Sequence, residues 1–90
     1  MATGSTPSTN DGRVRDLLLT LAAERGTEKT YCPSEAARRL WPEDWRDHMD
    51  DVRRVAALLI AERRLVATQR GDPVDPVGAK GPIRLGLPCR

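Results

Sequence analysis

The chain has 90 residues and a formal net charge of +2, from 15 basic and 13 acidic side chains. That length allows a single domain with a small core, and a charge of +2 does not by itself indicate nucleic-acid binding. No apolar stretch approaches the roughly 20 residues that a helix needs to cross a bilayer, so we expect no membrane-spanning helix. The two cysteines lie in unrelated contexts and do not make a disulfide framework.

Residues 1–12 (MATGSTPSTNDG) are mostly small or polar. Such a segment buries too little apolar surface to offset the entropy lost on ordering, so we predict a disordered N-terminal tail. The segment lacks the basic start and apolar run of a signal peptide. We therefore expect a soluble cytoplasmic protein in which Cys32 and Cys89 stay reduced.

The first predicted helix begins at Asp11, as its N-cap, or at Gly12, and it ends at Arg25 with Gly26 directly after it. Its apolar side chains recur at helical spacing and form one buried stripe: Val14, Leu17, Leu18, Leu21 and Ala22. The β-prone residues 30–32 then predict a short strand before the second helix.

The second predicted helix begins at Pro33, whose missing N–H costs nothing at the first helical position, and it ends before Pro42. Glu35 is placed to accept a hydrogen bond from the backbone of Cys32. The buried face of this helix consists of Ala36, Ala37, Leu40 and Trp41. Residues 42–48 predict a long, partly helical connection rather than a tight turn.

The third predicted helix spans residues 50–63, with Asp50 or Met49 as its N-cap. Its buried face consists of Val52, Val55, Ala56, Leu59 and Ile60. Its opposite face carries Arg53 and Arg54.

Two predicted strands, residues 65–69 and 83–85, pair as a hairpin across residues 70–82, which we call the wing loop. Glycine and proline punctuate the wing loop and keep it from forming a helix or a regular strand. A dozen residues is long for a hairpin connection.

Alternation along the second of these strands turns Ile83 and Leu85 inward and Arg84 outward. Asp72 and Asp75 in the wing loop are interpreted as turn formers. Arg84 can pair with either of them and tie the wing loop to its own strand.

A helix followed by a strand, a glycine-rich loop and a second strand is how a winged helix-turn-helix ends. We therefore predict an α+β fold: a winged helix-turn-helix with three helices and a small antiparallel β-hairpin wing. The domain is expected to span residues 13–86, with residues 87–90 as a loose C-terminal tail.

Charge is distributed unevenly along the chain. Residues 63–90 hold six basic side chains against two acidic ones, a net charge of +4. Residues 43–51, which we call the acidic segment, hold one basic side chain against five acidic ones, a net charge of −4. The chain is therefore basic at the predicted wing and acidic at the start of the third helix, the part that commonly enters the major groove.

Several short motifs occur together: YCPSEAA at residues 31–37, PEDWR at 42–46, DVRRVA at 51–56, VDP at 74–76 and GPIRL at 81–85. In this combination, residues 13–86 resemble a small bacterial family of domains of unknown function. The resemblance implies a winged-helix-like fold and no known activity, ligand or catalytic residue. Two positions look atypical for it: Arg63, where a helix-ending glycine is more usual, and Leu58, where a polar residue is.

Double-stranded DNA is the first candidate partner, because a winged helix presents a helix to the major groove and a wing to the backbone. The expected nucleic-acid-binding residues are the basic residues of the second helix, the third helix and the wing: Arg38, Arg39, Arg53, Arg54, Arg70, Lys80 and Arg84. Together they can neutralise several phosphates, and an arginine can bind guanine.

The alternative is a protein–protein interaction adaptor on the same scaffold, without DNA binding. The acidic segment separates the two hypotheses. If its carboxylates form helix caps and intramolecular pairs, DNA binding stays open. If they are exposed beside Arg53 and Arg54, the surface has mixed charge and suits a protein partner better.

We expect no catalytic activity, cofactor or metal site. His48 is the single histidine, and Cys32, His48 and Cys89 lack the spacing of zinc ligands. A helix N-terminus favours the thiolate of Cys32, but a partly buried structural cysteine is more common. Trp41 and Trp45 can form a base-stacking platform, although core packing is the more common role of such residues.

Overall fold

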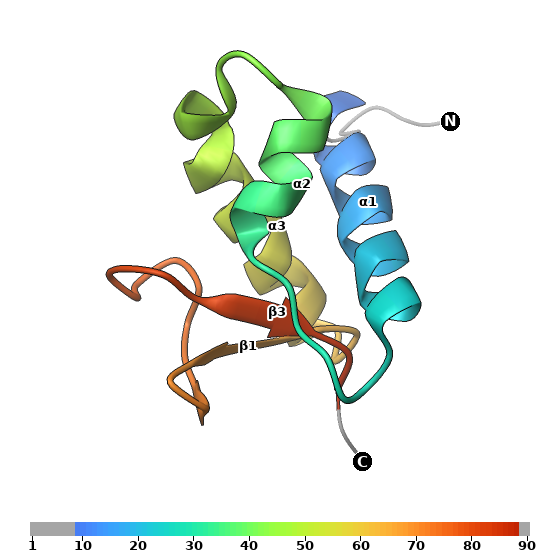
Figure 1. The fold of residues 1–90 in the computed structure, drawn as a ribbon, viewed down its shortest axis with the longest axis vertical. Helices are drawn as coiled ribbons and strands as arrows, with labels where there is room; N and C mark the ends of the chain where they lie inside the picture. The colour runs from blue at the N-terminus through green and yellow to red at the C-terminus, as the bar shows by residue number, and fades with distance from the viewer. Residues whose placement is uncertain (1–8, 89–90) are drawn as a thin grey trace.

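The computed structural model describes residues 9–88. Within this range, three helices come first: α1 (Thr9–Arg25), α2 (Pro33–Leu40) and α3 (Met49–Ala61), with the 3₁₀ helix η1 (Trp45–His48) before α3. An antiparallel sheet in the order β2-β1-β3 follows, made of β1 (Val66–Gln69), β2 (Asp72–Pro73) and β3 (Arg84–Gly86). The helices pack against one another and the sheet crosses one end of them (Figure 1). The predicted α+β class is confirmed, while the finer assignment as a winged helix-turn-helix stays a prediction.

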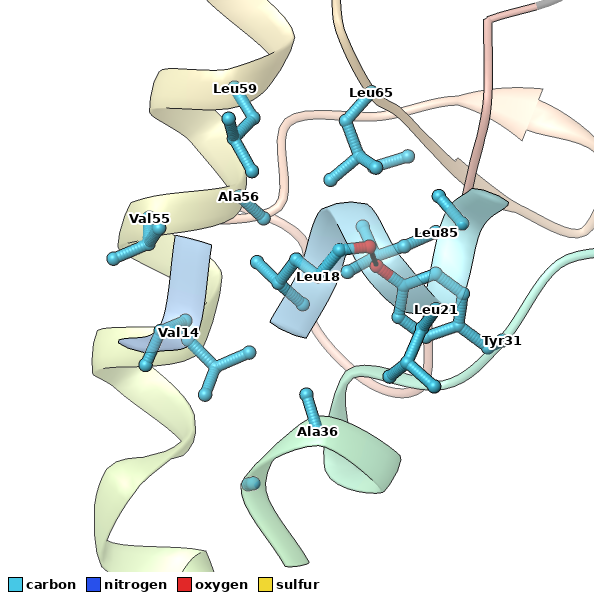
Figure 2. Packing of buried hydrophobic residues seen from close by; sticks show 14 of the residues in the cluster. Val14, Leu18, Leu21, Tyr31, Ala36, Val55, Ala56, Leu59, Leu65 and Leu85 are labelled. Carbon is cyan, nitrogen blue, oxygen red and sulfur yellow. Dashed lines mark hydrogen bonds between the residues drawn. The ribbon is translucent and has the colours of Figure 1, made fainter. Parts of the chain in front are cut away.

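One hydrophobic cluster joins the helices to the sheet. Leu18 and Leu21 of α1, Leu59 of α3 and Leu85 of β3 are inaccessible to solvent. Leu18, Leu21 and Leu85 lie beside the ring of Tyr31, and Leu59 belongs to the same cluster farther away on α3 (Figure 2). Since the chain has no phenylalanine, this tyrosine supplies the largest fully buried side chain of the described core.

Tyr31 also links the segment between α1 and α2 to helix α1 and to strand β3. Its hydroxyl donates a hydrogen bond to the carbonyl oxygen of Leu18 at 2.7 Å. Its backbone exchanges two hydrogen bonds with Leu85, at 2.9 and 2.7 Å. The strand predicted at residues 30–32 is therefore reduced to a single β-bridge, Tyr31 to Leu85.

Two predicted helix starts are wrong. α1 begins at Thr9, so Asp11 lies in its first turn instead of capping it, and residues 9–12 of the predicted disordered tail are helical. α3 begins at Met49 with His48 in the N-cap position, because η1 runs directly into α3 and leaves no extended residue before it. Residues 1–8 of the predicted N-terminal tail and 89–90 of the predicted C-terminal tail lie outside the described residues.

The wing loop contains a strand that the sequence analysis did not expect. β1 turns into β2 through Arg70 and Gly71, whose φ angles are 55° and 88°, and Gln69 pairs with Asp72. Two consecutive residues with positive φ are the signature of a type I′ hairpin turn. On the other edge of β1, β3 pairs antiparallel, with Leu85 buried and Arg84 exposed as alternation predicted.

α3 ends in a left-handed residue. Arg63 has a φ of 64°, its N–H donates to the carbonyl of Ile60 at 2.9 Å, and the N–H of Arg64 donates to Leu59 at 2.9 Å. This pair of hydrogen bonds defines a Schellman motif, whose left-handed position is normally a glycine. The atypical arginine noted in the sequence is therefore a conformationally costly one.

We expect Arg63→Gly to raise the free energy of unfolding by about 0.5–1 kcal/mol, because glycine adopts positive φ without a Cβ clash. Urea denaturation of the purified chain measures this change. Arg64→Gly is the matched control: its φ is not positive, so the same substitution there is expected to destabilise through the entropy of the unfolded chain. Equal effects at both positions would contradict the interpretation.

Candidate interaction surfaces

Arg53, one of the residues predicted to bind DNA, contacts the wing loop. From the middle of α3, its guanidinium donates to the carbonyl oxygens of Ala79 at 2.8 Å, Gly81 at 2.8 Å and Pro76 at 3.3 Å. A planar guanidinium is suited to several acceptors at once because its donors form a rigid fork. Arg53 therefore holds the wing loop against α3, and its donors face the chain's own carbonyls.

The wing loop presents these carbonyls because it folds back on itself. The side chain of Asp75 accepts a hydrogen bond from the N–H of Val77 at 2.9 Å, and the N–H of Ala79 donates to the carbonyl of Asp75 at 2.9 Å. Pro76 is buried. Asp75 thus acts as the turn former that its sequence context predicts.

Arg54 is paired with carboxylates. Its guanidinium reaches both oxygens of Asp11 in α1, at 2.7 and 3.1 Å, and one oxygen of Asp51 at 3.4 Å. The hydrogen bond with Asp11 raises the pKa of Arg54 above its ordinary value. Two neighbouring carboxylates offset the charge that Arg54 would bring to a phosphate.

The two arginines of α2 also have partners. The guanidinium of Arg38 lies 4.4 Å from the ring centre of Trp45, which Arg46 approaches to 4.8 Å. Arg39 lies 3.7 Å from a carboxylate oxygen of Glu35. Trp45 packs against the core and holds both guanidinium groups by cation–π contact.

Glu35 corrects a prediction made from the sequence. Its side chain accepts from both terminal nitrogens of Arg25 instead of reaching back to the backbone of Cys32. That hydrogen bond with Arg25 lowers the pKa of Glu35 below its ordinary value. The ion pair joins the end of α1 to the start of α2.

The basic side chains of the wing divide into two kinds. Arg84 donates to the side chain and the backbone carbonyl of Thr30, at 3.0 and 2.9 Å, so the predicted pairing of Arg84 with Asp72 or Asp75 is wrong. Arg70 and Lys80 are exposed, and their side chains make no hydrogen bond or ion pair within residues 9–88.

The acidic segment is mostly exposed. Asp44 lies 3.2 Å from His48 and Asp51 contacts Arg54, but α3 has no side-chain cap. The carboxylates of Glu43, Asp47 and Asp50 are exposed and form no ion pair with the described part of the chain. The acidic segment therefore meets each of the two conditions in part: two of its carboxylates are in intramolecular pairs, and three are exposed near the start of α3.

Both tryptophan rings, considered above for base stacking, are already in contact with other side chains of the chain. Trp41 stacks on the ring of His48, with ring centres 3.8 Å apart and planes 6° from parallel, and Trp45 lies beneath Arg38 and Arg46. Cys32 is half-buried, is not in a disulfide, and accepts a hydrogen bond from the hydroxyl of Ser34 at 3.1 Å.

Residues 9–88 contain neither a membrane-spanning helix nor a cluster of metal ligands. Each helix there is too short or too polar to cross a bilayer. No group of three or more histidine, cysteine or acidic side chains in this range is placed to hold a metal ion.

One surface was missed by the sequence analysis: a small hollow between α1 and α3, lined by Asp11, Gly12, Arg15, Val55 and Leu58. Leu58 is 52% exposed. Its atypical position was the available signal, but the residues of α1 that form the other wall precede Leu58 by 43 to 47 positions in the sequence.

The similarity to known sequences reaches every helix and strand described above. A family model described as protein of unknown function (DUF3253) matches residues 11–88. The chain belongs to this family. The match spans nearly all of the described residues and confirms the resemblance to a domain family of unknown function. No curated protein matches the chain.

Proposed function

We propose that this chain is a non-catalytic protein-interaction module that binds its partner through α3 and the adjoining acidic segment. The proposal rests on the contacts that Arg53 and Arg54 make within the chain. Their guanidinium groups are occupied by three carbonyl oxygens and two carboxylates of the same chain.

The charges beside these arginines support the same conclusion. Asp47 of η1 and Asp50 of α3 are exposed, and neither forms an ion pair with a basic side chain among residues 9–88. A duplex carries one negative charge per roughly 1.7 Å of its axis, so these carboxylates oppose its approach. A protein surface with both basic and apolar groups suffers no such repulsion.

We expect a photo-crosslinking amino acid at Asp50 to capture a protein in cells that produce the chain, whereas the same amino acid at exposed Ala23 of α1 does not. Binding of the identified partner, purified and titrated by calorimetry, is expected to weaken about tenfold or more in an Asp47→Lys, Asp50→Lys double variant, because complementary charge is reversed. Capture of nucleic acid from Asp50, or unchanged partner affinity in the double variant, would refute the proposal.

A second candidate, duplex binding through the wing, is favoured by Arg70 and Lys80, which are exposed and have no side-chain partner within residues 9–88. Fluorescence anisotropy of a mixed-sequence duplex at about 50 and 200 mM salt tests it. If the wing binds DNA, Arg70→Ala with Lys80→Ala lowers the salt slope by about 2, and Arg54→Ala leaves it unchanged. Absence of binding at low salt would exclude this candidate.

A further inference from the structure

Two arginines with left-handed backbone conformation flank strand β1. Among residues 9–88, the non-glycine residues with positive φ are Arg63 and Arg70, at 64° and 55°. Arg63 ends the Schellman motif after α3, and Arg70 begins the turn from β1 to β2. Glycine adopts such angles without a Cβ clash, so arginine is the less stable choice at both positions. Backbone strain of this kind concentrates where a side chain has a function.

The side chains of these two arginines do not stabilise the fold. Both are exposed, and neither forms a hydrogen bond or an ion pair within residues 9–88. By contrast, Arg15 and Arg54 are bound to carboxylates of the same chain. The charges at the two ends of β1 are therefore available to a ligand.

A third cation lies between them, on the outer face of the sheet. The antiparallel register sets Arg84 of β3 opposite Thr68 of β1, while the neighbouring pair, Ala67 and Leu85, is buried on the other face. Arg84 is exposed, and its Nε and Nη2 donate to the hydroxyl and the carbonyl of Thr30 at 3.0 and 2.9 Å. These neutral acceptors fix the guanidinium in place, and its Nη1 has no acceptor in the described residues.

Basic side chains outnumber acidic ones in this part of the chain. Residues 63–88 hold five basic side chains and two acidic ones. The carboxylate of Asp75 accepts a backbone hydrogen bond inside the wing loop, and Asp72 lies on the edge strand β2. The acidic segment lies at the opposite end of the helices from the sheet (Figure 1). A polyanion at the sheet is therefore far from the carboxylates that oppose a duplex at α3.

We propose that Arg63, Arg84 and Arg70 form a binding site for single-stranded nucleic acid, which they contact through its phosphates. The four residues of β1 alone separate the first and last of these arginines by about 13 Å, at roughly 3.3 Å per residue. A row of charges of this length fits an extended chain of phosphates better than one small anion. The site goes beyond the proposed function, because it gives the sheet end of the molecule a ligand of its own.

The composition of the sheet favours a flexible nucleic-acid strand over other polyanions. Strands β1, β2 and β3 contain no aromatic residue, so their outer face lacks the anchors that dominate protein interfaces. Phosphate contacts need only cations and hydrogen-bond donors, and they do not depend on base sequence. A single strand bends to bring its phosphates to cations at fixed positions, whereas a duplex is stiff over about 150 base pairs.

Fluorescence anisotropy of a labelled oligothymidylate of about 20 nucleotides, titrated with the full chain at about 50 and 200 mM salt, tests the proposal. Each phosphate contact on a single strand contributes about 0.7 to the salt slope, so three arginines predict a slope of about 2. In an Arg63→Gly, Arg70→Asn double variant we expect weaker binding and a slope of about 0.7. Both replacements suit positive φ, so urea denaturation should show a more stable protein, and lost binding is then not lost folding.

The matched control is an Arg13→Gln, Arg46→Gln double variant, which changes the net charge equally. Both of these arginines are exposed and lie in α1 and η1, and we expect the native slope. Equal loss of binding in the two double variants would overturn the proposal, because net charge alone would explain it.

Two other results would also overturn it: no binding of the single strand at low salt, or binding only after the strand is annealed to its complement. The second result would assign Arg70 to the duplex-binding wing instead. No protein partner is present in these titrations, so their failure is distinct from failure of the crosslinking experiment at Asp50.

Discussion

The Tyr31→Ala protein is expected to be largely unfolded at 25 °C, because the substitution lowers the free energy of unfolding by about 3–5 kcal/mol. The ring of Tyr31 is inaccessible to solvent and lies where α1, α2 and β3 meet. A domain of this size has only a few kcal/mol of net stability, so the loss removes most of it. Circular dichroism and urea denaturation measure the result.

Tyr31→Phe separates the ring from the hydroxyl. It keeps the packing and removes the hydrogen bond to Leu18, so it is expected to cost about 0.5–1.5 kcal/mol. A Phe variant as unstable as the Ala variant would show that the hydroxyl, and not the ring, dominates.

The native protein and Tyr31→Phe should also differ in stability at high pH. Burial raises the pKa of Tyr31 well above its ordinary value, so the folded protein keeps the hydroxyl proton while the unfolded chain releases it near pH 10. This contribution to stability is fully present below about pH 10 and is lost as the pH rises above it. In Tyr31→Phe that loss disappears, and equal pH dependence of the two proteins between pH 8 and 11 would contradict the assignment.

Arg53→Ala is expected to lower the free energy of unfolding by about 2–3 kcal/mol, because it removes a charged donor from three carbonyls, two of them partly buried. The effect should be concentrated in the wing loop, where amide hydrogen exchange of residues 74–82 accelerates. Arg53→Lys restores the charge but not the fork of donors, so it should recover stability only in part.

Arg54→Ala is the matched control for Arg53, one residue along the same helix. Its partners are carboxylates in an exposed ion pair, which is typically worth at most about 1 kcal/mol. If the two alanine variants lose the same stability, or if hydrogen exchange in the wing loop is unchanged in Arg53→Ala, the structural role assigned to Arg53 is wrong.

Much of the local structure was predictable because its causes lie within a few residues. Gly26 ends α1 with a φ of 76°, Pro33 opens α2, and α2 ends before Pro42. The buried positions of α3 follow from the helical period, and alternation placed Leu85 inside. The errors concerned helix starts and caps, the strand expected at residues 30–32, the missed strand β2 and the partner of Arg84. At these places contacts from elsewhere in the chain compete with local preference.

The helices, the pairing of β1 with β3, most of the core and the uneven charge could therefore be predicted from the sequence, since periodicity, proline and glycine act over a few residues. The contacts of the charged side chains depend on the tertiary fold. Arg54 and Asp11 are 43 residues apart in the chain, Arg15 and Glu62 are 47 apart, and Arg84 and Thr30 are 54 apart. A charge pattern shows that an arginine needs a partner, but the partner is chosen by which surfaces the hydrophobic core brings together.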